Sequence, residues 1–161
     1  MRIGILHYWA HEYDHAIQQI KMVNEMAPNF ANPYVWLGCA YLEKKDYTGA
    51  TNAFQKAVRL SGRAPVALIG LGIAYARAGK TKEGEEILAE LLLASKKQYI
   101  PEFYMACLYG ALGRKDEAFE WLEKSYQERS NGLSAIKVYP LIDDLRSDPR
   151  FAEMLRRLKL D

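Results

Sequence analysis

The chain repeats itself every 34 residues, and no gap is needed to align the copies. Shifting the sequence against itself by this period places small residues on small residues and large apolar residues on large ones. Small residues let two helices approach closely, and large residues fill the space around them. The repeat therefore predicts a stack of similar units that each contact their neighbours. The clearest columns are Gly4, Gly38, Gly72, Ala106; Ala16, Ala50, Gly84, Ala118; and Ile20, Phe54, Leu88, Leu122.

Each unit has the pattern of two helices joined by a tight turn. Apolar residues recur at helical spacing, as from Leu37 to Tyr41. Gly79 and Gly113 can end the first helix of their units in a left-handed conformation, and Lys45 stands at the same place without glycine. The pattern predicts helices over 1–10, 13–26, 33–44, 47–60, 65–78, 81–96, 99–112 and 115–128.

The end of the chain leaves the repeat and predicts a cap. Ser147 or Asp148 can cap a helix whose first turn holds Pro149. An apolar stripe from Phe151 to Leu158, with basic residues on the other face, suits a terminal helix over 149–159. The predicted fold is all-α, a right-handed α-solenoid of antiparallel helix pairs with about four units. Its predicted domains are a solenoid over 1–132, with units at 1–30 (truncated), 31–64, 65–98 and 99–132, and a C-terminal extension with its capping helix at 133–161.

These columns resemble the tetratricopeptide repeat, whose units carry Leu-Gly, Tyr, Ala, Phe, Ala and Pro at fixed offsets. The second unit matches best, and in the first unit His7 stands where tyrosine is usual. The resemblance covers roughly residues 1 to 132. It implies a protein-interaction scaffold rather than an enzyme. The matching residues of the second unit are Leu37, Gly38, Tyr41, Ala50, Phe54 and Ala57.

A second resemblance concerns the tail. The string Leu-Arg-Ser-Asp-Pro-Arg-Phe from Leu145 to Phe151, with the Tyr-Pro-Leu that starts at Tyr139, is similar to the end of tetratricopeptide domains in bacterial multidomain regulators. Those proteins include winged-helix transcription regulators, nucleotide cyclases and protein kinases. Met1 also falls in the middle of a unit's first helix, which favours a fragment of a longer protein over a natural start with an atypical repeat.

The first helix of each unit is expected to line the concave surface, where solenoids bind their partners. Chaperone-binding relatives hold a carboxylate there with Lys, Asn and Arg, because a carboxylate needs hydrogen-bond donors. Val35, Cys39, Ile69 and Ile73 supply no useful donor, which excludes a carboxylate clamp. The sequence predicts a largely apolar protein-binding groove lined by Tyr8, Trp9, Val35, Cys39, Leu42, Glu43, Ile69, Ile73, Arg77, Phe103 and Cys107.

An apolar groove of this length would promote aggregation if it were exposed to solvent. Its cover could be a partner peptide, a second copy of the chain in a homo-oligomer, or the chain's own tail. The apolar segment from Ile136 to Ile142 follows the last unit, and we expect it to fold back into the C-terminal half of the groove. The same residues could also serve only to pack the solenoid and narrow the groove, with no ligand role.

Two functions therefore remain. One is a scaffold that binds a peptide or protein segment in the apolar groove. The other is the regulatory or sensory C-terminal domain of a larger transcription regulator, cyclase or kinase, with the groove filled by its own chain.

Residues that could suggest chemistry have structural explanations. His7, His11 and His15 are spaced to seat a metal on one helix, but the repeat puts His11 in a turn and gives His7 the packing place of a tyrosine. We expect no metal and no other cofactor. Cys39 and Cys107 occupy equivalent columns two units apart, too far for a disulfide, and are expected to be small apolar residues of the groove wall.

No catalytic constellation stands out. Ser134 and Lys137 fit the Ser-x-x-Lys pattern of penicillin-recognising enzymes without its partner motifs, and the pair Asp143 and Asp144 suits a turn. The net charge of +2 is too small to favour nucleic acid or an anionic membrane, and no apolar run could span a bilayer. Two cysteines fit a reducing compartment. A cytoplasmic, non-enzymatic protein is expected.

Overall fold

The computed structural model describes residues 1–160, so Asp161 of the predicted extension lies outside the described residues. The described residues form α-helices and two 3₁₀ helices, with no strand among them. None of these helices combines the length and the apolar character needed to cross a bilayer. The helices are α1 (Arg2–Trp9), α2 (Tyr13–Met26), α3 (Ala31–Glu43), α4 (Tyr47–Leu60), α5 (Pro65–Arg77), α6 (Thr81–Ala94), α7 (Glu102–Ala111), α8 (Lys115–Gln127), η1 (Asn131–Ala135), η2 (Pro140–Leu145) and α9 (Pro149–Arg157).

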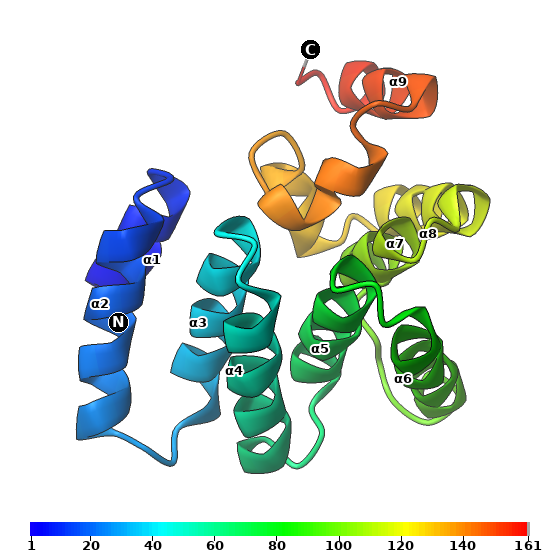
Figure 1. Cartoon of the computed structure of the whole chain (residues 1–161). Coiled ribbons are helices and arrows are strands. Elements are labelled where there is room, and N and C mark those ends of the chain that lie inside the picture. The colour runs from blue at the N-terminus through cyan, green and yellow to red at the C-terminus, as the bar shows by residue number, and fades with distance from the viewer. Residues whose placement is uncertain (161) are drawn as a thin grey trace.

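Helices α1 to α8 form the solenoid of antiparallel pairs that the repeat predicts. Each unit pairs its two helices, α1 with α2, α3 with α4, α5 with α6 and α7 with α8. Successive units stack because α2 packs against α3, and α4 against α5, while α5 also packs against α7. Figure 1 shows the pairs following one another across the molecule, with the tail running on from α8 to α9. The fold is thus a helical solenoid, as expected.

The turn inside each unit obeys the 34-residue period in its backbone. The second residue after the first helix has a positive φ in all four units, namely 60° at His11, 58° at Lys45, 76° at Gly79 and 77° at Gly113. The following amide donates to the carbonyl five residues earlier at 2.9 Å, as from Asp46 to Tyr41, which satisfies a carbonyl that the helix leaves unpaired. The prediction that Lys45 replaces glycine at this turn is confirmed.

Glycines on α3 and α5 leave room for a ring of α4 between the two helices. A Cβ added to Gly38 would lie 2.7 Å from the Phe54 ring, and one added to Gly70 would lie 2.2 Å from the other side of the same ring. Phe54 is fully buried. The ring therefore fills the space between α3 and α5, and glycine is required on both sides of it.

Helix α7 begins at Glu102, although the sequence predicts a helix from residue 99. Pro101 explains the error, because a proline disfavours the helical conformation of the residue before it. Pro101 itself lies before the helix with extended dihedrals, φ −63° and ψ 119°. The remaining predicted boundaries agree within about two residues, the usual uncertainty of helix ends.

The predicted capping helix is α9. The Asp148 carboxylate accepts a hydrogen bond from the Arg150 amide at 3.1 Å, and Pro149 occupies the first turn. Phe151 and Met154 face the core, while Arg157 pairs with Glu123 of α8 at 2.6 Å. A cap of this kind covers the last unit and presents a polar face to solvent.

Candidate functional site: the concave groove and its tail

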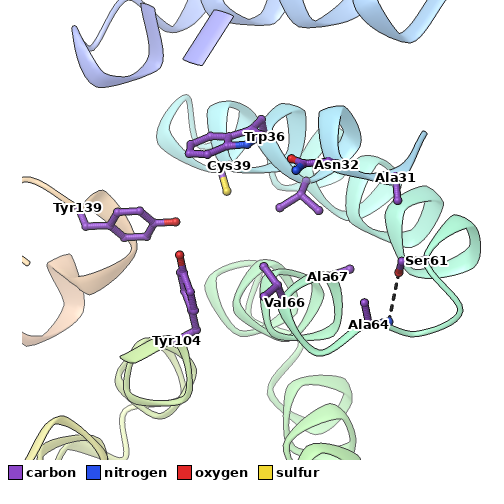
Figure 2. Close-up of a pocket in the computed structure, with 11 residues that line it drawn as sticks. Ala31, Asn32, Trp36, Cys39, Ser61, Ala64, Val66, Ala67, Tyr104 and Tyr139 are labelled. Atoms are coloured by element: carbon purple, nitrogen blue, oxygen red, sulfur yellow. Dashed lines mark hydrogen bonds between the residues drawn. The ribbon is translucent and has the colours of Figure 1, made fainter. Parts of the chain in front are cut away.

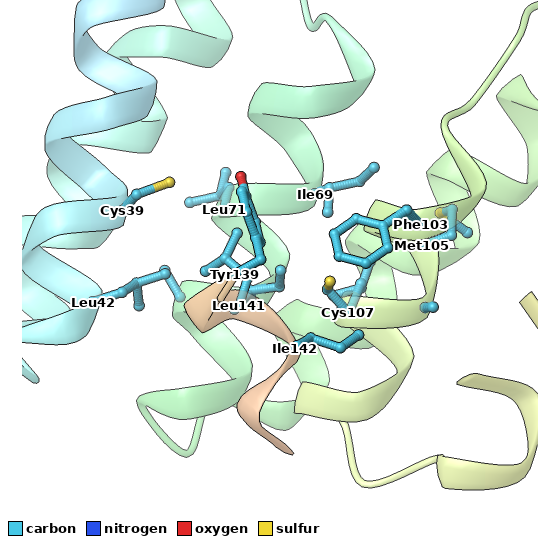
Figure 3. Packing of buried hydrophobic residues seen from close by; sticks show 14 of the residues in the cluster. Cys39, Leu42, Ile69, Leu71, Phe103, Met105, Cys107, Tyr139, Leu141 and Ile142 are labelled. Atoms are coloured by element: carbon cyan, nitrogen blue, oxygen red, sulfur yellow. The ribbon is translucent and has the colours of Figure 1, made fainter. Parts of the chain in front are cut away.

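The tail after α8 lies in the concave groove, as the apolar segment from Ile136 to Ile142 predicts. Tyr139 contacts Phe103 and Tyr104 of α7, with ring centroids 5.6 and 5.8 Å apart, and also Trp9 of α1 at 5.3 Å. One side chain of the tail thus touches both the first and the last unit. Figure 3 shows Tyr139, Leu141 and Ile142 inserted among buried side chains of α3, α5 and α7.

The tail is buried as deeply as the solenoid core. Ile136, Ile142 and Leu145 have no exposed surface, and Leu141 is almost fully covered. Leu145 packs on Gly110 of α7, where an added Cβ would lie 3.0 Å from its Cγ. Burial of this extent removes a large apolar area from water. Each Å² of buried apolar surface stabilises the fold by about 25 cal/mol. The segment is therefore part of the folded core.

Arg77 at the end of α5 fixes the tail by polar contacts. Its guanidinium donates to the Asp144 carboxylate at 2.8 and 3.1 Å, and to the carbonyls of Pro140 and Leu141 at 3.4 Å each. Its other terminal nitrogen lies 3.6 Å from Glu43 Oε1 of α3. The planar fork of arginine suits such multiple contacts. A residue predicted to bind a partner instead holds the chain's own tail.

Glu43 is the least satisfied group of this site. Its Oε1 atom is buried and has no hydrogen-bond partner among the described residues. Burial raises the pKa of Glu43 from 4.5 to about 7, and Arg77 offsets only part of this rise. Asp143 and Asp144 of the tail add to the rise through like-charge repulsion. The contact between tail and groove thus contains a carboxyl group that titrates near neutral pH.

Arg146 stiffens the tail from within. It donates to the carbonyls of Lys137 and Tyr139 at 2.9 and 3.1 Å, and it pairs with Asp143 at 2.5 Å. The backbone carbonyls of a segment without regular helix would otherwise need water. This arginine therefore holds η2 and the residues before it in one compact shape.

The predicted groove residues are on the concave side, but most of them are not open to a partner. Side chains of the tail pack among several of them (Figure 3). Their role as a binding surface stays a prediction, because seven of the eleven residues are almost fully buried: Tyr8, Cys39, Leu42, Ile69, Ile73, Phe103 and Cys107. The other four, Trp9, Val35, Glu43 and Arg77, are partly exposed.

The two cysteines are inert parts of this wall. Burial raises the pKa of the Cys39 thiol to about 12, and it raises the pKa of Cys107 further. Both are free thiols. A thiol is nucleophilic only as the thiolate, so neither residue is suited to catalysis at neutral pH.

An open pocket of about 340 Å³ remains beside the tail. It lies between α3, α5 and α7, and Tyr139 closes one end of it (Figure 2). The hydroxyl groups of Tyr139 and Tyr104 point toward each other at this end. The lining residues are mainly apolar: Ala31, Asn32, Val35, Trp36, Cys39, Ser61, Ala64, Val66, Ala67, Tyr104 and Tyr139.

Only Val35 and Cys39 of this pocket belong to the predicted groove set. Sequence reasoning missed Trp36, Val66 and Tyr104, and it places Tyr139 in the groove only as part of the apolar segment from Ile136 to Ile142. The aromatic pair Trp36 and Tyr104 could have been found, because the two residues occupy the same column of the repeat two units apart. Tyr139 lies outside the repeat, and its place in the pocket follows from how the tail folds.

Two family models of the tetratricopeptide repeat match the chain, one over residues 41–107 and one over residues 105–131. Together they cover the chain from residue 41 to residue 131, which is more than half of its length. A comparison with curated proteins gives no match.

Proposed function

This chain belongs to the tetratricopeptide repeat family, and on that premise we propose that it binds a segment of a partner protein in the groove pocket beside Tyr139. Tetratricopeptide repeats generally mediate protein–protein interaction, and the family typically serves as a non-catalytic scaffold. The observation that supports the site most is an open apolar pocket beside the tail, between α3 and α5.

The chemistry of the pocket suits an apolar or aromatic anchor side chain. Its volume lies at the lower end of the range for ligand pockets, about 300 to 1,000 Å³. Val35 and Val66 form apolar walls, and Trp36 and Tyr104 add aromatic surface. Aromatic and aliphatic anchors in a pocket supply most of the binding energy at protein interfaces.

The rim of the pocket can orient the backbone of the bound segment. Asn32 is exposed at the start of α3, and its amide group both donates and accepts hydrogen bonds. Ser61 lies opposite and already accepts a hydrogen bond from the Ala64 amide at 3.2 Å. A short extended segment with one large apolar side chain is therefore the partner that fits best.

A peptide selection tests this proposal. Peptides enriched from a displayed random library against the whole chain should bind Val66→Glu at least about tenfold more weakly, because a charge enters the apolar wall. Val66 is 39% exposed, so the variant should fold. Leu93→Glu on the exposed side of α6 is the matched control and should bind like the wild type. Equal binding of all three proteins would refute the pocket.

The proposal also carries several negative expectations. We expect no enzymatic activity, no cofactor in the groove, and no direct contact with nucleic acid or membrane. The compartment that fits two buried free thiols is the reducing cytoplasm. Assembly into a homo-oligomer remains compatible with the proposal.

A second candidate function is regulatory, as the C-terminal domain of a larger transcription regulator, cyclase or kinase. The observation that favours it is that the chain fills most of its own groove, so that Arg77 and the apolar wall contact the tail instead of a ligand. Expression of the complete open reading frame tests this alternative. An effector domain encoded ahead of Met1 would support it, and an open reading frame that starts at Met1 would refute it.

A further inference from the structure

The turn between α1 and α2 gathers three possible metal ligands that belong neither to the groove nor to its tail. His7 Nδ1 lies 2.5 Å from Glu12 Oε2, and His15 Nδ1 lies 3.8 Å from the same oxygen. One ligand atom from each of the three residues lies within 4.8 Å of the other two. The centroids of the His7 and His15 imidazole rings lie 5.4 Å apart, and the ring planes are tilted by 51°.

The backbone of the turn creates this arrangement. His11 takes the left-handed conformation, and the Glu12 amide then donates to the His7 carbonyl at 2.9 Å. Glu12 precedes α2 but its side chain makes no capping hydrogen bond. Because residues three apart share one face of a helix, Glu12 and His15 point the same way. The Glu12 carboxylate is thus directed at the two imidazoles instead of the helix end.

His11 is excluded from the cluster, as the repeat predicts. Its Nδ1 lies 2.6 Å from the Tyr13 hydroxyl. The three-histidine site considered from the sequence therefore does not form, and Glu12 takes the place of His11. No histidine spacing could have pointed to Glu12, because its position depends on the left-handed turn.

Two imidazole nitrogens and one carboxylate oxygen form a donor set that binds Zn²⁺, with a fourth position open to water. Imidazole also suits Cu²⁺ and Ni²⁺. We propose that His7, Glu12 and His15 form a surface site for a divalent transition-metal ion, and that Zn²⁺ is the principal ion bound there. All three side chains are partly or largely exposed, so an ion can enter without rearrangement of the core.

The surrounding charges permit such an ion. Lys44 lines the same surface pocket as Glu12 and His15, and it forms an ion pair with Asp14, which offsets much of its repulsion toward a cation. The remaining groups around the site are His11 and Tyr13.

A bound ion would tie the first helix pair together. His7 comes from α1, whereas Glu12 and His15 come from the cap and the first turn of α2. Binding to the folded chain alone stabilises the folded state. The expected consequence is slower hydrogen exchange in α1 when the ion is present.

Calorimetric titration of Zn²⁺ into the whole chain, without an affinity tag, tests the site. Cys39 and Cys107 are buried and should not compete for the ion. We expect saturable binding of one ion per chain at pH 7.5, weaker by at least about tenfold in Glu12→Gln and in His15→Ala, since each removes one of three ligands. His11→Ala is the matched control and should bind like the wild type.

Circular dichroism confirms that each variant is folded, and hydrogen exchange of α1 with and without Zn²⁺ supplies a second reading. Absence of saturable binding to the wild type would overturn the proposal. Equal weakening by His11→Ala and His15→Ala would overturn it as well, because it would assign the ion to scattered histidines.

Discussion

Apolar side chains in the same columns of the repeat are buried at the C-terminal end of the solenoid and exposed at the N-terminal end. At the C-terminal end Met105 and Leu108 of α7 are fully buried. Their counterparts at the N-terminal end, Ile3 and Leu6 of α1, are 60% and 67% exposed. The residues are equally apolar, but only the later units have another helix against them. Burial in a solenoid is thus decided by the neighbouring unit, and the column shows only which face is available for burial.

The ends differ in their turns and covers as well. The left-handed turn position is occupied by His11 and Lys45 in the first two units but by Gly79 and Gly113 in the last two. The tail and α9 pack on α7 and α8. The C-terminal half combines unstrained turns with a cover, and we expect it to be the more stable half.

The largest expected effect comes from Tyr139→Ala, because Tyr139 is the residue that joins the tail to both ends. Loss of a buried aromatic side chain should reduce the free energy of unfolding by about 3 kcal/mol. Val138→Ala, at the exposed neighbouring position, should change it by less than about 0.5 kcal/mol. Urea unfolding monitored by circular dichroism measures both. Equal, small effects would mean that the tail does not bridge the ends.

Leucine can be replaced by alanine at equivalent positions of the first and the last unit, which tests the comparison of the two ends directly. Leu108→Ala should cost about 3 kcal/mol of unfolding free energy, since the side chain is fully buried. Leu6→Ala should cost less than about 0.5 kcal/mol, since its side chain already faces solvent. Thermal and urea unfolding give both values. A large loss in Leu6→Ala would show that α1 is covered in solution.

Glu43 should make the free energy of unfolding depend on pH. Its pKa of about 7 in the folded chain exceeds 4.5, so the folded state binds this proton more tightly than the unfolded state. The free energy of unfolding should therefore fall as the pH rises from about 4.5 to about 7. Glu43→Gln should remove this fall and be more stable than the wild type at pH 8, by on the order of 2 kcal/mol.

Urea unfolding at a series of pH values provides the measurement for this prediction. Glu86→Gln on the exposed face of α6 is the matched control and should keep the slope of the wild type. An unchanged slope in Glu43→Gln would mean that this carboxyl group is solvated in solution.

The smallest effect is expected at the turns. Lys45 has a φ of 58°, which disfavours a residue with a side chain, so Lys45→Gly should stabilise the chain by about 0.5 to 1 kcal/mol. The reverse change, Gly79→Lys, should destabilise it by a similar amount. Differential scanning calorimetry of both variants tests this. Stabilisation by both would show that turn strain does not distinguish the two halves.

The repeat period made most of the fold predictable. It located the helices of all four units and the left-handed position at Lys45, because these features depend on residues close together in the chain. Periodicity alone failed at Pro101. A proline disfavours the helical conformation of the residue before it, so α7 begins later than the repeat predicts. The apolar tail could be assigned to the groove because it directly follows the last unit and the groove is lined by apolar residues that need a cover.

The site was less predictable, because it depends on contacts between distant residues. Ile69 and Ile73 have the right place in the column for a groove, but both are almost fully buried. The reach of Tyr139 to Trp9 spans nearly the whole chain and leaves no periodic signal. Glu12 joins His7 and His15 only because His11 reverses the backbone. Such contacts require the three-dimensional path of the chain.

The central claim is that the tail covers the groove wall, and the reactivity of Cys39 and Cys107 tests it most directly. Both thiols lie in that wall and are almost fully buried. Mass spectrometry can follow the labelling of each cysteine by a thiol reagent in the native chain and in Tyr139→Ala. We predict that both thiols are protected in the native chain and that Tyr139→Ala, still folded, exposes Cys39 faster. Labelling of the native chain as fast as in urea would contradict a groove closed by its own tail.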